Sequence, residues 1–68
     1  MNKNMLKSVM VLNGDTNHDL AEYLGISDPT LSLKMNETNG AEFTQGEIKK
    51  MIDRYHLTAE QTLQIFFN

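Results

Sequence analysis

His18 and His56 are the side chains of this sequence best suited to proton transfer or metal binding near neutral pH. Neither has a serine or a second histidine at a suggestive spacing, and the sequence contains no cysteine. The glycine near the start of an expected helix is Gly46, which stands alone and does not form a phosphate-binding loop. The sequence therefore predicts neither an enzyme nor a metal or cofactor site.

Residues 16–36 have the order of polar and small residues expected of two short helices joined by a tight turn. Thr16 can cap the first helix in a capping box with Asp19, and Gly25 can end it through a left-handed conformation. Ser27 can cap the second helix, and Pro29 fits in its first turn, where a missing N–H costs nothing. Together these features predict a helix-turn-helix.

The same segment resembles the helix-turn-helix of the phage Cro and repressor family. The residues that match the family pattern are Asn17, Ala21, Gly25, Ile26, Ser27 and Leu31. Segments 42–44, 55–58 and 65–67 are also similar to small Cro-like proteins encoded in phages and prophages of Gram-positive bacteria. The resemblance implies one all-α, five-helix, lambda-repressor-like domain over residues 1–68, with its helix-turn-helix at about 16–36.

Membership of this family would place the helix at 28–36 in the major groove of operator DNA. The residues implied to face the bases are Ser27, Asp28, Pro29, Ser32 and Leu33. The residues implied to hold phosphates are Asn17, Lys34, Asn36, Thr38 and Asn39. Asp28, Pro29 and Leu33 depart from the Gln, Arg, Asn or Ser that the family favours. Because a carboxylate only accepts hydrogen bonds, Asp28 can read a cytosine amino group but repels phosphate.

The charge balance supports a second hypothesis. Six lysines and arginines face nine aspartates and glutamates, which gives a formal net charge of −3. Proteins gain much of their affinity for DNA by neutralising phosphates, so a basic surface is the usual mark of a DNA-binding protein. The alternative is a modulator or antirepressor that binds a companion repressor protein through the same face. Leu33 suits either hypothesis, because it can contact a thymine methyl or an apolar protein side chain.

Apolar periodicity predicts three further helices. The stripe of the first, over residues 2–12, is Met5, Leu6, Val9 and Met10, extended by Val11 or Leu12. A later helix begins with a capping box at Thr44 and Glu47, and its stripe is Ile48, Met51, Ile52 and Tyr55. The last helix begins with a capping box at Thr58 and Gln61, and its stripe is Leu63, Phe66 and Phe67. Residues 36–41 are expected to form a loop.

Three apolar residues, Ile65, Phe66 and Phe67, stand near the end of the sequence. One hypothesis is that they seal the core of a very small domain. The other is that they form the contact of a homodimer, which would set the spacing between two DNA half-sites.

The length of 68 residues suffices for one domain, which buries about 60% of the surface of its unfolded chain. The absence of cysteine fits a reducing cytosol. No apolar run approaches the roughly 20 residues that cross a bilayer, and the first residues lack the apolar stretch of a signal peptide. The sequence therefore predicts a location in the cytoplasm of a bacterial host cell, with no membrane partner.

Overall fold

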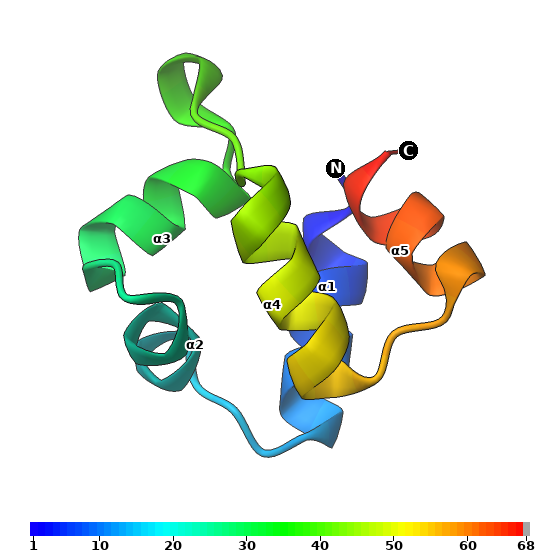
Figure 1. The fold of residues 1–68 in the computed structure, drawn as a ribbon. Helices are drawn as coiled ribbons and strands as arrows, with labels where there is room; N and C mark the ends of the chain where they lie inside the picture. The colour runs from blue at the N-terminus through cyan, green and yellow to red at the C-terminus, as the bar shows by residue number, and fades with distance from the viewer. Residues whose placement is uncertain (68) are drawn as a thin grey trace.

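The computed structural model describes residues 1–67, which form five α-helices and one short 3-10 helix and contain no strand. The elements are α1 (Lys3–Leu12), α2 (Asn17–Leu24), α3 (Asp28–Met35), η1 (Thr38–Gly40), α4 (Gln45–Tyr55) and α5 (Ala59–Phe66). α4 runs through the middle of the molecule, with α2 and α3 to one side of it and α5 to the other (Figure 1). The two ends of the described chain lie close together, and the Asn2 N–H donates to the Ile65 carbonyl over 2.6 Å. The predicted all-α architecture with five helices is confirmed.

Local sequence signals determine where the helices begin. The Thr16, Thr44 and Thr58 hydroxyls each accept the backbone N–H of the residue three positions later. The side chain of that third residue accepts in return from the threonine N–H, so all three predicted capping boxes are present. Ser27 caps α3 through the Thr30 N–H, and Pro29 lies in the first turn of that helix, as expected.

α2 ends at the predicted glycine, and α3 ends one residue before its predicted limit. Gly25 follows α2 with φ 75°, a left-handed conformation that costs glycine little. The Ile26 N–H then reaches back to the Ala21 carbonyl over 3.0 Å, which closes the end of the helix. α3 ends at Met35, one residue before the predicted limit, and Asn36 is its C-cap.

Each of the five α-helices contributes one large, fully buried side chain to a single core. These side chains are Leu6, Leu20, Leu31, Met51 and Ile65. Smaller or slightly more exposed apolar residues complete the core, and Phe43, Ile48 and Phe66 pack partly buried against it. Non-directional burial of this kind supplies most of the driving force for folding. Because α3 shares this core through Leu31, the rest of the molecule fixes its orientation.

The apolar stripes of α1 and α5 differ from those predicted. Val11 and Leu12 are 76% and 85% exposed, so they do not extend the buried stripe of α1. Val11 follows Leu6 by five positions, which turns it about 140° around the helix and away from the core. In α5 the buried residue is Ile65, whereas Leu63 is exposed because it lies two positions, or roughly 200°, away. None of the helices among residues 1–67 is both long enough and apolar enough to span a membrane.

Candidate nucleic-acid interface

The candidate interface is built on α2 and α3, which pack directly against one another. Leu31 and Met35 are the buried residues of α3, and Leu20 and Ala21 are buried residues of α2. Three residues separate the helices, Gly25 to Ser27, so their relative orientation is set by a short turn and a shared core. The opposite side of α3 is therefore held outward on a rigid support.

All five residues predicted to face DNA bases are exposed on this outer side of α3 and at its N-cap. They are Ser27, Asp28, Pro29, Ser32 and Leu33. Leu33 is 47% exposed, a large fraction for an apolar side chain in the middle of a helix. The structure thus brings the predicted base-facing set together on one surface, which we call the outer face of α3.

Two of the hydroxyls on this surface already take part in local hydrogen bonds. Ser27 Oγ accepts the Thr30 N–H over 3.2 Å and donates to Thr30 Oγ1 over 2.8 Å. Ser32 Oγ accepts a long 3.4 Å hydrogen bond from Asn36. Ser27 is therefore largely engaged as a helix cap, whereas Ser32 is freer to meet a ligand.

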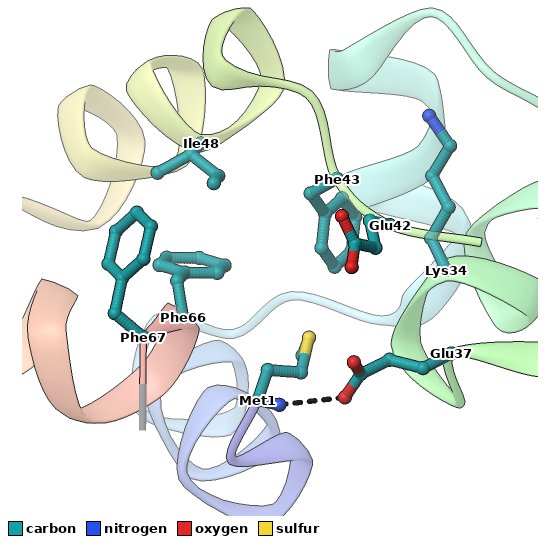
Figure 2. A pocket seen from close by; sticks show the side chains of 8 residues that line it. All are labelled: Met1, Lys34, Glu37, Glu42, Phe43, Ile48, Phe66 and Phe67. Atoms are coloured by element: carbon teal, nitrogen blue, oxygen red, sulfur yellow. Dashed lines mark hydrogen bonds and ion pairs between the residues drawn. The ribbon is translucent and has the colours of Figure 1, made fainter. Parts of the chain in front are cut away.

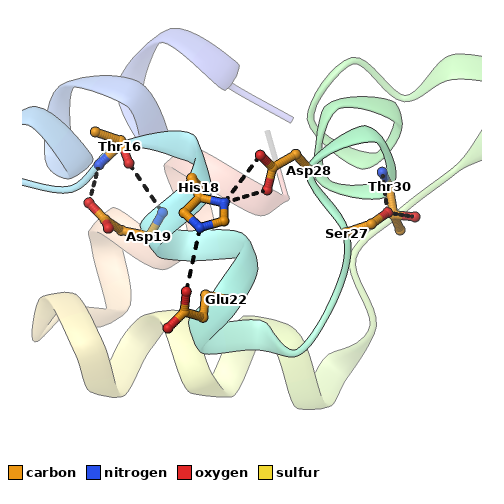
Figure 3. Close-up of polar contacts among 7 residues, drawn as sticks. All are labelled: Thr16, His18, Asp19, Glu22, Ser27, Asp28 and Thr30. Atoms are coloured by element: carbon orange, nitrogen blue, oxygen red, sulfur yellow. Dashed lines mark hydrogen bonds and ion pairs between the residues drawn. The ribbon is translucent and has the colours of Figure 1, made fainter.

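Asp28 pairs with a histidine on the neighbouring helix (Figure 3). His18 Nδ1 lies 3.0 Å and 3.2 Å from the two Asp28 carboxylate oxygens. The other ring nitrogen, Nε2, lies 3.5 Å from a Glu22 oxygen. The hydrogen bond to Asp28 raises the pKa of His18 above its usual value. This contact, which joins the starts of α2 and α3, was not predicted from the sequence.

The residues predicted to hold phosphates lie at both ends of the two-helix unit. Asn17 is exposed at the start of α2, and Asn36, Thr38 and Asn39 are exposed after α3. The segment after α3 is not a plain loop, because residues 38–40 form the 3-10 helix η1. Figure 1 shows η1 on the opposite side of α3 from α2, so these polar groups flank the outer face of α3.

Lys34 does not face outward as predicted. Its ammonium group donates to both Glu47 oxygens over 2.6 and 2.8 Å, and only 17% of its side chain is exposed. Burial alone would raise the pKa of Glu47, but hydrogen bonds from Lys34 and the Thr44 N–H outweigh burial and lower it. Lys34 lies on the side of α3 that meets α4, where it neutralises a carboxylate of the scaffold. It is therefore a poor candidate for phosphate binding.

A second ion pair, also missed by the sequence analysis, holds the loop before α2 to α4. Arg54 Nε and an Arg54 terminal nitrogen donate to the two Asp15 oxygens over 2.6 and 2.8 Å. The Tyr55 hydroxyl donates to the same carboxylate over 2.7 Å. The Arg54 guanidinium also lies 4.6 Å from the ring centre of Tyr23. The hydrogen bond from Arg54 lowers the pKa of Asp15, and burial raises the pKa of Tyr55.

The predicted dimer contact at residues 65–67 needs a correction. Ile65 is fully buried, so it seals the core and is inaccessible to a second subunit. Phe66 is partly buried and packs edge-to-face on Phe43, with ring centres 6.1 Å apart. Phe67 is 66% exposed and is the one member of the three that is available for a partner.

A cavity of about 200 Å³ lies where α3, α4 and α5 approach one another (Figure 2). Its lining is Met1, Lys34, Glu37, Glu42, Phe43, Ile48, Phe66 and Phe67. The Met1 amine is bonded to Glu37 over 2.7 Å at one edge. The rings of Phe66 and Phe67 lie side by side along another edge, on the α5 side.

Charge on the two-helix unit is mainly negative. Asp19, Glu22 and Asp28 are exposed there, and Lys34 is the one lysine or arginine of residues 16–36, where it is paired internally. The lysines without an ion pair among residues 1–67 are Lys3, Lys7, Lys49 and Lys50, which lie on α1 and α4. No group of three or more His, Asp or Glu side chains in the described part of the chain could hold a metal ion. No family model, curated protein or solved structure matches this chain.

Proposed function

We propose that this protein is a transcriptional regulator of the phage Cro and repressor type that binds operator DNA. In this proposal α2 and α3 form a helix-turn-helix, and α3 lies in the major groove. The observation that carries the proposal is the outer face of α3. Its five side chains are exposed together at the start and along one side of a short helix, and the other side of that helix is fixed in the core. A rigid helix with one uncovered face is what major-groove readout needs.

The flanking groups fit contacts to the DNA backbone on both sides of α3. Asn17 lies in the first turn of α2, where free N–H groups and the helix dipole favour a phosphate. Thr38 and Asn39 lie on the other side, in η1. Neutral side chains and backbone N–H groups position DNA without adding charge. Asn36 is a weaker member of this set, because its side-chain oxygen already accepts from Lys3 over 2.7 Å.

Operators of such regulators are read by symmetric dimers, so the proposal includes a homodimer. Of the C-terminal residues that were predicted to form its contact, Phe67 is the exposed one. The place of action would be the cytoplasm of a bacterial host cell, where the operator lies.

The test is a mobility-shift titration of the protein alone on the DNA around its own promoter, repeated over a salt series. A scrambled duplex of the same composition is the control. We expect selective binding that weakens as salt rises, with a shallow slope because few cations lie near the proposed interface. The variant Leu33→Asp should weaken selective binding, whereas Leu12→Asp, which changes an exposed leucine on α1, should not. Absence of selective binding at low salt and micromolar protein would overturn the proposal.

A second candidate function is supported by the charge of the same face. Asp19, Glu22 and Asp28 are exposed there, and no lysine or arginine of this unit is free to meet phosphate. A surface of this kind, with Leu33 at 47% exposure, suits a basic and partly apolar protein surface. The candidate is a modulator or antirepressor that binds a companion repressor. It predicts that Leu33→Asp abolishes binding to a repressor encoded nearby, measured by calorimetry, while the protein alone never binds DNA selectively.

A further inference from the structure

We propose that His18 and Asp28 form one reading unit, in which the His18 ring holds the Asp28 carboxylate at the start of α3 so that it accepts a hydrogen bond from the amino group of a cytosine. The inference rests on the proposed function and names a positioning residue and a base preference within it. It also makes the recognition of DNA depend on the protonation of His18.

The geometry brings together two side chains from different helices. His18 is in the first turn of α2, Asp28 is the first residue of α3, and both Asp28 oxygens lie within 3.2 Å of His18 Nδ1 (Figure 3). Because an ionised carboxylate can only accept hydrogen bonds, we assign the proton to Nδ1, where both oxygens share it. This arrangement ties the carboxylate to the scaffold through α2.

The Asp28 carboxylate can still accept hydrogen bonds from a ligand. Two carboxylate oxygens offer about four lone-pair positions, and the shared N–H faces one on each oxygen, which leaves about two. Asp28 is 56% exposed at its side chain, so the remaining positions are open to a ligand. A cytosine edge in the major groove offers an amino donor and no acceptor. Adenine also has an amino group, but its N7 acceptor would repel the carboxylate, and thymine and guanine present O4 or O6 acceptors.

Asp28 and Glu22 contact the His18 ring, and Asp19, which is bonded to the Thr16 N–H, acts on it through its charge alone. Asp28 belongs to α3, and Glu22 and Asp19 belong to the same helix as His18. Their combined effect, led by the hydrogen bond to Asp28, raises the pKa of His18. When the ring is protonated, its positive charge offsets the negative charge of Asp28, which would otherwise repel the phosphates of a duplex. When the ring loses its proton, that compensation ends, and we expect selective affinity to fall by about tenfold as pH rises through the His18 titration.

The first arm of the test observes the pair without DNA. Proton NMR follows the titration of His18 in the wild-type protein and in Asp28→Asn. We expect the pKa of His18 to fall in the variant, because the hydrogen bond to Asp28 is the largest cause of its raised value. A His18 titration unchanged by Asp28→Asn means that the pair does not form in solution, and it overturns the proposal.

The second arm measures the base preference. Each cytosine of the operator half-site is replaced in turn by thymine, with its partner guanine changed to adenine, and binding is measured at pH 6 and pH 8. We expect one position at which replacement weakens wild-type binding by at least about fivefold. That penalty should largely disappear in Asp28→Asn, since an amide can both donate and accept. His18→Gln should remove the pH dependence and reduce the cytosine preference.

Glu22→Gln is the matched control, because it removes a carboxylate that faces the other nitrogen of the same ring. It should shift the pH midpoint slightly and leave the base preference intact. Selective binding with no cytosine position that responds to Asp28→Asn overturns the inference and leaves the proposed regulator standing. No selective binding by the wild type overturns the proposed function together with the cytosine contact, and the NMR arm then decides separately whether the pair exists.

Discussion

Two aspartates, Asp15 in the loop before α2 and Asp28 at the start of α3, each pair with a basic side chain of a helix distant in the chain or adjacent in space, yet their surroundings differ sharply. Asp15 exposes 8% of its side chain and accepts two hydrogen bonds from Arg54 and one from Tyr55. Asp28 exposes 56% of its side chain and is bonded to the ring of His18 alone. The first carboxylate is fully satisfied within the protein, whereas the second keeps lone pairs that face solvent.

The difference indicates which charges of this chain belong to the scaffold. Arg54 belongs to α4 and Lys34 belongs to α3, and each is paired with a carboxylate over 2.6 Å. These pairs tie α4 to the loop before α2 and to α3. Two of the six basic side chains are thus held inside the framework, and the outer face of α3 retains its negative charge. Shielded pairs of this type contribute to the stability of the fold, while exposed pairs contribute little.

The largest expected effect comes from Asp15→Asn. The change removes the charge that Arg54 and Tyr55 contact, and hydrogen bonds to a charged group contribute about 2 kcal/mol. We expect the free energy of unfolding, measured by urea denaturation, to fall by about that amount. Asp28→Asn is the matched control, because it makes the same chemical change at an exposed site, where about 0.5 kcal/mol or less is expected. Equal losses in the two variants would show that burial does not separate the two pairs.

The next largest effect is the loss of stability in acid, which we expect to arise from the shielded carboxylates of Asp15 and Glu47. The pKa values of Asp15 and Glu47 are lower in the folded protein than their ordinary values. Their contribution is therefore complete above about pH 4.5 and is lost as pH falls through the lower folded values. We expect the urea midpoint of the wild type to decline between pH 5 and pH 2.5, and Asp15→Asn to decline less. A decline of the same size in the variant would exclude Asp15 as a source.

Local patterns were the part of this fold that the sequence predicted well. The capping box at Thr16 and the left-handed Gly25 involve partners within five residues, so their chemistry can be read directly from the chain. The pair of Asp15 and Arg54 joins residues 39 positions apart, and nothing in local spacing indicates such a contact. Lys34 was misplaced for the same reason, since its partner Glu47 belongs to another helix.

In the candidate site, too, the sequence predicted local features but not contacts between residues of different helices. Exposure of Ser32 and Leu33 follows from helix period once the buried Leu31 and Met35 are identified. The contact between His18 and Asp28 depends on how α2 and α3 meet, which the sequence did not specify. Ile65 was assigned to two possible roles because an apolar residue near a chain end can belong to a core or to an interface. The packing of α5 on α1 places it in the core.

Removal of the Tyr55 hydroxyl should have a smaller effect than removal of the Asp15 charge. Tyr55→Phe deletes one donor to Asp15 and leaves both bonds from Arg54, so we expect a loss of about 1 kcal/mol in urea denaturation. Tyr23→Phe is the control, because that tyrosine contacts Arg54 through its ring, which the substitution keeps. A loss in Tyr23→Phe as large as that in Tyr55→Phe would mean that loss of a tyrosine hydroxyl near Arg54 destabilises the protein whether or not that hydroxyl bonds to Asp15.

The smallest effect on folding is expected from His18→Gln. The pKa of His18 is raised in the folded protein, so its contribution is present below the ordinary value of 6.5 and is lost as pH rises through the folded value. Since 68% of the His18 side chain is exposed, water screens that contribution. We expect the urea midpoints of wild type and variant to agree at pH 8 and to differ barely at pH 5.5. A loss comparable to that of Asp15→Asn would make the exposed pair a part of the scaffold, and the contrast between the two aspartates would then fail.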